Sequence, residues 1–129
     1  MSEQTRPAPG FVGWVDLTVE DAPRIRDFYR DVVGWETSDV DMGGYSDYCM
    51  LPPGSHAPVA GVCHARGANA ALPPVWLVYI TVADLEHALT RCRELGGEVL
   101  SLPRTTPGYG SFAVIRDPAG AVAALFEAA

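Results

Sequence analysis

The residue with the clearest chemical potential is Asp16, a carboxylate within a mostly apolar run that begins at Phe11. A carboxylate on an apolar surface loses hydration, which favours its protonated form unless hydrogen-bond donors compensate. Such a group can transfer protons as a general acid or base, with Tyr79 as its partner. It can equally hold a ligand amine or hydroxyl, or be a structural carboxylate that accepts hydrogen bonds from Tyr79 or Thr81.

The chain repeats its own residue pattern after 63 positions, a shift that brings Val15 onto Val78. The same shift aligns further identical residues without a gap, among them Thr18 with Thr81, Asp21 with Asp84 and Gly34 with Gly97. The signals for strands, helices and turns repeat along with these identities. The sequence therefore predicts two copies of one structural unit.

Each half begins with alternating residues over 14–19 or 77–82, which predicts a strand with one face on a packed layer. Asp21 or Asp84 then caps a helix, and glycine ends that helix at Gly34 or at Gly96 and Gly97. Three further strand-like runs follow in each half, at 35–41, 45–51 and 58–65, and at 98–102, 111–115 and 121–127. Each half is therefore predicted to be a βαβββ module.

These modules predict an α+β fold in which two βαβββ units form a curved, barrel-like mixed sheet around a cavity, with the helices outside. The modules are expected at 11–65 and 75–128, joined by a linker of small residues at 66–74. Residues 11–129 then make a single domain, and residues 1–10 are expected to be a flexible tail.

The charge balance excludes some classes of partner. The 129 residues include 16 acidic and 9 basic side chains, a net charge of −7. No basic face is available to displace the counterions of a nucleic acid or to meet an anionic membrane. No apolar segment is long enough for a membrane span or typical of a signal peptide. The three cysteines form no CxxC pair, which fits a reduced, cytoplasmic location.

Three segments resemble a known family: VDLTVEDAPRIRDFYRDVVGWE from Val15, ELGGEVL from Glu94 and IRDPAGAVAALFE from Ile115. They are similar to the vicinal oxygen chelate superfamily, which contains glyoxalases, bleomycin-resistance proteins, fosfomycin-inactivating enzymes and extradiol dioxygenases. The resemblance covers residues 11 to 127. It implies the fold more firmly than the activity, because this fold hosts isomerases, lyases, dioxygenases and simple binding proteins.

The resemblance also implies where metal ligands would stand. Carried over residue by residue, the ligand positions fall on Trp14, Gly61, Leu77 and Ala124. None of these side chains can bind a divalent ion, so we expect neither a metal ion nor another cofactor. His64 and Glu127 form another repeat pair that could ligate an unusual metal, although strand alternation places them on the opposite faces.

The same alternation predicts an apolar and aromatic cavity between the modules, as is typical of a small-molecule site. Trp14 and Tyr79 would offer flat faces for stacking, and the small residues Gly61 and Ala124 would leave room for a ligand. Trp14 could instead simply fill the core. With Asp16, the other residues expected to line the cavity are Thr18, Tyr45, Tyr48, Cys63, Leu77, Phe112 and Phe126.

Two functions remain open from the sequence. The first is a metal-independent binding protein, similar to the bleomycin-resistance branch, that holds an aromatic or apolar natural product. The alternative is a metal-independent isomerase, lyase or cyclase that uses Asp16 as general acid or base, with Tyr79 as its partner. The resemblance further implies a homodimer.

Overall fold

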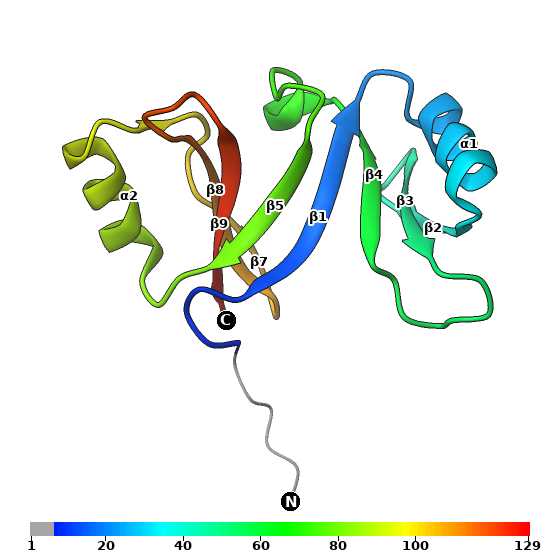
Figure 1. Ribbon diagram of the computed structural model, residues 1–129, viewed down its shortest axis with the longest axis horizontal. Coiled ribbons are helices and arrows are strands. Elements are labelled where there is room, and N and C mark those ends of the chain that lie inside the picture. Colours follow the sequence, from blue (N-terminus) through cyan, green and yellow to red (C-terminus); the bar gives the residue numbers. More distant parts are fainter. Residues whose placement is uncertain (1–6) are drawn as a thin grey trace, which may run out of the picture. The chain divides into compact units, whose positions relative to one another are not determined.

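The computed structural model describes residues 7–129 and confirms the α+β fold of two βαβββ modules (Figure 1). Within this range lie nine strands, two α-helices and one 3₁₀ helix, Gly67–Asn69, which falls in the predicted linker. Neither helix has the length and apolar character that crossing a membrane would need. The chain divides into a first unit, Trp14–Trp76, and a second unit, which combines Leu77–Ala129 with the N-terminal residues up to Gly13.

The first unit is a four-stranded mixed sheet with one helix on one face. Its elements are β1 (Val12–Val19), α1 (Ala22–Val33), β2 (Glu36–Asp41), β3 (Ser46–Leu51) and β4 (Ala60–His64). The strand order is β2-β3-β4-β1, with β1 parallel to β4 and the other neighbours antiparallel. Because β1 and β4 are parallel, their carboxyl ends lie at the same edge of the sheet.

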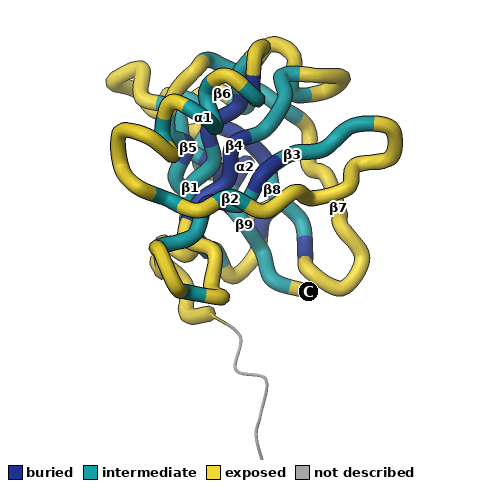
Figure 2. The backbone as a smooth tube through the Cα atoms, turned by 90° about the vertical axis from the view of Figure 1, so that its right-hand side faces the viewer, coloured by how far each residue is buried: buried dark blue, intermediate teal, exposed yellow. Residues whose placement is uncertain are grey.

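The core of the first unit lies between the sheet and α1. Its fully or almost fully buried members include Ala22 of α1 together with Met50, Ala60 and Val62. Figure 2 shows the buried segments on the inner strands, whereas β2 is largely exposed. Residues that alternate with this core along the strands must face the other side of the sheet.

The second unit repeats this plan. Its elements are β5 (Trp76–Thr81), α2 (Leu85–Glu94), β6 (Glu98–Val99), β7 (Arg104–Thr106), β8 (Gly110–Arg116) and β9 (Val122–Ala128). The order is β5-β9-β8-β6, and β7 also pairs with β8. The core against α2 contains Leu85, Leu89, Ala113 and Leu125.

The helices begin and end where the sequence predicts. The Asp21 carboxylate accepts a hydrogen bond from the Arg24 amide at 3.3 Å, and Asp84 accepts from the His87 amide at 3.0 Å. These contacts satisfy amides that have no partner inside the helix. Gly34 closes α1 in the left-handed conformation, with φ at 88°.

The second module differs from the prediction because the run 98–102 is not one strand. The amides of Leu100 and Ser101 both donate to the Val114 carbonyl, and Ser101 Oγ accepts from the Val114 amide at 3.0 Å. This bulge interrupts the ladder, and Pro103 then has no amide to donate. Pairing with β8 resumes only at β7, which gives nine strands where eight were expected.

The N-terminal segment joins the second unit earlier than predicted. Gly10 donates its amide to the Thr81 carbonyl and the Thr81 amide donates to the Phe11 carbonyl, each at 2.8 Å. The predicted tail therefore ends before Gly10. Its first six residues lie outside the described part of the chain.

Candidate functional site

The sheet of the first unit has a polar and aromatic face on the side opposite α1. Strand register places Asp16 beside Gly61 and Thr18 beside Cys63 across β1 and β4, and Cys49 beside Gly61 across β3 and β4. Thr18 is buried, whereas Asp16 and Cys63 are half-buried. We call this group, together with Trp14, the Trp14 face.

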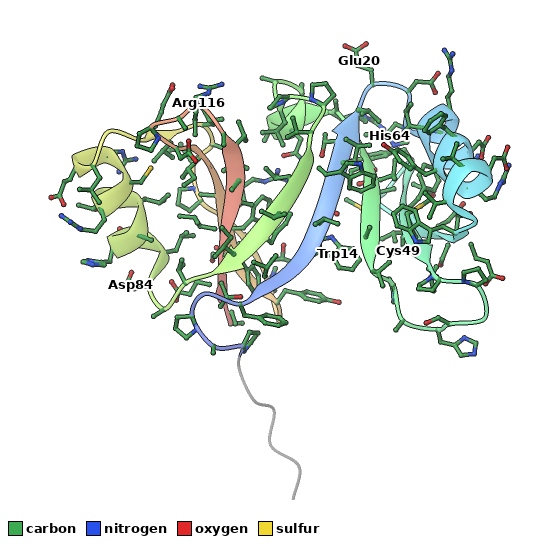
Figure 3. The ribbon with its side chains drawn as sticks, viewed as in Figure 1. Trp14, Glu20, Cys49, His64, Asp84 and Arg116 are labelled. Atoms are coloured by element: carbon green, nitrogen blue, oxygen red, sulfur yellow. The ribbon has the colours of Figure 1, made fainter. Side chains whose placement is uncertain are left out.

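Trp14 and Asp16 are held together on this face. The indole Nε1–H of Trp14 donates to Asp16 Oδ1 at 2.5 Å, which is short enough for a charge-assisted hydrogen bond. The two side chains lie on the same face because they are two residues apart on one strand. Figure 3 shows Trp14 near the lower end of β1. The structure thus gives Asp16 a donor that the sequence analysis did not name.

Gly61 has no side chain, and this leaves the space that the hydrogen-bonded side chains of Trp14 and Asp16 occupy. A Cβ atom at Gly61 would collide with Asp16 Oδ1 and would lie 3.5 Å from Trp14 Cζ2. The space above Gly61, expected to be left for a ligand, is therefore occupied by the protein's own carboxylate and indole. A ligand would meet the surface formed by Trp14 and Asp16 rather than the sheet backbone.

The two thiols on this face are poor nucleophiles. Burial raises the pKa of Cys63, and the nearby carboxylates of Asp16 and Asp47 raise it further. Burial, followed by the Asp16 charge, also raises the pKa of Cys49. Because the thiolate is the reactive form, both cysteines stay protonated near neutral pH and contribute weak donors and apolar surface.

The corresponding face of the second unit is aromatic. The rings of Tyr79 and Phe112 lie 5.6 Å apart, and Phe112 pairs with Phe126 across β8 and β9. The Arg104 guanidinium lies 5.5 Å from the centre of the Phe112 ring. Ala124, which is opposite Tyr79 in the register, is completely buried, and Leu77 is nearly so. The predicted proton-transfer partner Tyr79 thus has an aromatic neighbour within its own unit.

The structure places Tyr48 on the side of the sheet that packs against α1 and not on the Trp14 face. Tyr48 is only 7% exposed and belongs to the core against α1 with Met50 and Val62. Strand alternation explains this position, because Tyr48 and Met50 are two residues apart and must share a face. Tyr45 lies just before β3, where its ring contacts Arg66 and His64 rather than the Trp14 face.

An aspartate–histidine pair was missed by the sequence analysis. Asp47 Oδ1 accepts the backbone amide of His64 at 2.9 Å and lies 3.2 Å from His64 Nδ1. The two residues are on neighbouring antiparallel strands, so only the register of β3 against β4 brings them together. The register of β3 against β4 cannot be predicted from a local sequence pattern, because a long connection separates the two strands.

Glu127, the repeat counterpart of His64, has a different role. Its Oε1 accepts the backbone amide of Leu85, the first residue of α2, at 2.7 Å. A carboxylate at the start of the helix accepts a hydrogen bond from an amide that has no partner inside the helix. Its negative charge also interacts favourably with the positive end of the helix dipole. Glu127 and His64 therefore each contact a partner within their own unit.

The donor set does not fit the metal site that the family resemblance implies. The four corresponding positions hold an indole whose N–H already binds Asp16, a glycine, a leucine and an alanine. Within residues 7–129, no group of three or more histidine, cysteine or acidic side chains is arranged to hold a metal ion. Metal sites in proteins need several such donors around one point.

Two pockets of about 310 Å³ lie away from the Trp14 face. One is in the second unit, where residues 7–9 face residues 81–83 and Ala128. The other is in the first unit and is lined by Leu17, Val19, Ile25, Phe28, Tyr29, Pro74, Val75 and Trp76. The first pocket includes Thr81, and neither pocket includes Trp14, Asp16 or Tyr79.

Each unit has mixed strands, one covering helix and an opposite polar or aromatic face, which is the arrangement of a βαβββ module. Residues 11–125 match the model of the Glyoxalase/Bleomycin resistance protein/Dioxygenase superfamily, and the chain belongs to this family. Over 93% of the chain and 88% of the other, the fold is similar to methylmalonyl-CoA epimerase from Mycobacterium tuberculosis, with a TM-score of 0.56 and 20% identity.

Curated relatives include two proteins of Streptomyces. The anthracycline biosynthesis protein DauV from Streptomyces sp. (strain C5) is 38% identical over 88% of this chain and 40% of its own length. The anthracycline biosynthesis protein DnrV from Streptomyces peucetius is 31% identical over 95% of this chain and 49% of its own length. The chain thus spans less than half the length of either relative.

Proposed function

We propose that this chain is a metal-independent binding domain for a small aromatic or apolar molecule, and that the Trp14 face takes part in binding. The observation that carries the proposal is the half-buried Trp14 indole, held by Asp16 above a glycine. A ring fixed in this way loses little conformational entropy when a planar ligand stacks on it.

The chemistry of the surrounding residues supports the same ligand class. The Trp14 face adds Thr18 and two protonated thiols to the indole and the carboxylate, so it combines apolar surface with few polar groups. The aromatic residues Tyr79, Phe112 and Phe126 provide a comparable surface in the second unit. Anthracyclines, which appear in the names of both Streptomyces relatives, are planar polycyclic aromatics of this class.

Replacing Trp14 with phenylalanine is expected to weaken binding of a planar aromatic by about tenfold, because the smaller ring loses both stacking area and its anchor on Asp16. The measurement is a fluorescence titration with 1,4-dihydroxyanthraquinone, in which the unmodified chain shows saturable tryptophan quenching. Trp35→Phe is the matched control, since Trp35 packs with Tyr29 and Trp76 near α1.

Binding without turnover predicts that the anthraquinone is recovered unchanged after long incubation, as checked by liquid chromatography. Equal quenching and affinity in the Trp14→Phe variant and the unmodified chain would contradict a role for this face. Absence of saturable quenching with any planar aromatic would contradict the proposed ligand class.

One observation favours a second candidate, a metal-independent isomerase, lyase or cyclase. Asp16 is a half-buried carboxylate in a fixed position on an otherwise weakly polar face, as a proton-transfer group must be. Asn at this position retains an oxygen that can accept from Trp14 but cannot take up a proton.

Asp16→Asn is therefore expected to lower any proton-transfer activity by about 10²–10⁴-fold while leaving ligand affinity nearly unchanged. The measurement is deuterium exchange at the carbon next to a ligand carbonyl, followed by NMR in D₂O. Asp41→Asn, an exposed substitution, is the control. Exchange that proceeds equally in the unmodified chain and in the Asp16→Asn variant would remove Asp16 from the mechanism.

A further inference from the structure

A second group of chemically active side chains lies at the carboxyl end of β4, away from the Trp14 face. We define the His64 cluster as His64, Asp47, Tyr45 and Arg66, all within the first unit. Figure 3 shows His64 near the upper end of β4 and Trp14 near the lower end of β1, so the two groups lie at different ends of this sheet. The proposed ligand site described above does not use the His64 cluster.

The Asp47 carboxylate orients the imidazole of His64. Its Oδ1 accepts the His64 backbone amide and faces His64 Nδ1 at 3.2 Å. Because an ionised carboxylate only accepts hydrogen bonds, the neutral imidazole carries its proton on Nδ1. The lone pair of the ring is then on Nε2.

Nε2 of His64 is open to an external partner. The His64 side chain retains 18% of its exposure, and its only side-chain hydrogen bond within residues 7–129 is the one between Nδ1 and Asp47. No side-chain nitrogen or oxygen atom in that range is both buried and without a partner, so Nε2 reaches the surface. An imidazole oriented by a carboxylate and open at Nε2 is the arrangement of a general base.

Aromatic rings and a cation surround this base. The Tyr45 ring meets the imidazole edge-on at 5.4 Å, and the Tyr48 ring lies 6.0 Å away. The Arg66 guanidinium lies 3.8 Å from the centre of the Tyr45 ring and has no acidic partner among the described residues. On the α1 side, Arg26 lies over Tyr48 at 4.6 Å and pairs with Asp27. An exposed guanidinium without a carboxylate can stabilise a ligand anion.

We propose that the His64 cluster binds a small, weakly acidic hydroxyaromatic molecule and that His64 Nε2 accepts its hydroxyl proton. The ligand O–H bond breaks, an N–H bond forms at Nε2, and the electron pair stays on the ligand oxygen. Asp47 stabilises the resulting imidazolium, and Arg66 stabilises the phenolate. Tyr45 provides the aromatic contact for the ligand ring.

The test uses 4-nitrophenol as the probe, because its phenolate absorbs visible light and its neutral form does not. The experiment is run with the whole chain in buffer near neutral pH, where the free probe is only partly ionised, and the increase in its phenolate fraction on binding is measured. The unmodified chain is expected to produce a saturable increase in phenolate absorbance. His64→Gln is expected to abolish it, and Asp47→Asn to reduce it at least tenfold. His87→Gln, a change at an exposed histidine of α2, is the matched control and is expected to behave like the unmodified chain.

Arg66→Met provides an independent variant if the His64 and Asp47 variants fail to fold, since Arg66 is exposed. It is expected to weaken phenolate binding at least fivefold. The proposal is overturned if the unmodified chain produces no increase in phenolate, if the probe binds only as the neutral phenol, or if His64→Gln or Arg66→Met matches the unmodified chain. Trp14→Phe is expected to keep the phenolate signal, so failure of this proposal and failure of the proposed function are distinguishable.

Discussion

Met50→Ala is expected to lower the free energy of unfolding by about 2–5 kcal/mol. Met50 is completely buried between the sheet of the first unit and α1, in contact with the cluster that contains Ala22, Ala60 and Val62. The surrounding side chains are packed in the core, so they relax only partly into the space that the long side chain leaves. The lost apolar transfer energy and the remaining cavity therefore both contribute to the cost.

Urea unfolding followed by circular dichroism measures this effect. Met42→Ala is a control of the same chemical type, because Met42 is 46% exposed and its replacement is expected to change the free energy by less than about 0.5 kcal/mol. Equal effects of the two substitutions would contradict the placement of Met50 in the core. They would also undermine the assignment of Tyr48, which shares its face, to the core.

Gly61→Ala is expected to cost about 1–3 kcal/mol, because its methyl group would overlap Asp16 Oδ1. Gly61 has no positive φ, so the backbone itself accepts alanine without strain. The cost therefore reports the contact with the Asp16 carboxylate and not a conformational requirement for glycine. Displacement of that carboxylate is also expected to change Trp14 fluorescence.

An Asp16→Ala background tests this explanation. Without the carboxylate, the added methyl group meets no close polar neighbour, and the cost of Gly61→Ala is expected to fall below about 0.5 kcal/mol. The coupling free energy from the double-mutant cycle is then about 0.5–3 kcal/mol, which is the range for residues in direct contact. A cost that is the same in both backgrounds would show that Asp16 does not occupy the space above Gly61.

Much of the fold is predictable because its signals are local. Asp21 and Asp84 cap helices through amides only three residues away, and Gly34 ends α1 with a backbone conformation that glycine adopts easily. The alternation along β1 also predicts that Asp16 and Thr18 share one face of the sheet. The register of β1 against β4 agrees, because it places Asp16 beside Gly61 and Thr18 beside Cys63. The break between β6 and β7 was missed, because Ser101 replaces a ladder hydrogen bond with its side chain.

The candidate sites are less predictable because they depend on which strands meet and in which register. The sequence shows that Trp14 and Asp16 share a face, but a side-chain rotation decides that the indole N–H meets the carboxylate. Asp47 and His64 are 17 residues apart, and the pairing of β3 with β4 brings them together. Tyr48 is an aromatic residue of the kind that often lines ligand sites. It lies instead on the α1 side of the sheet, where it packs with Met50 and beneath Arg26.

By itself the sequence determined that this protein has two βαβββ modules, where their helices begin, and which residues share a strand face. These features follow from backbone hydrogen bonding and from the two-residue period of strands, which act over a few neighbouring positions. Only the tertiary structure decided that Asp16 binds Trp14, that Glu127 caps α2, and that Asp47 orients His64. Those contacts depend on strand register and core packing, in which distant parts of the chain take part together.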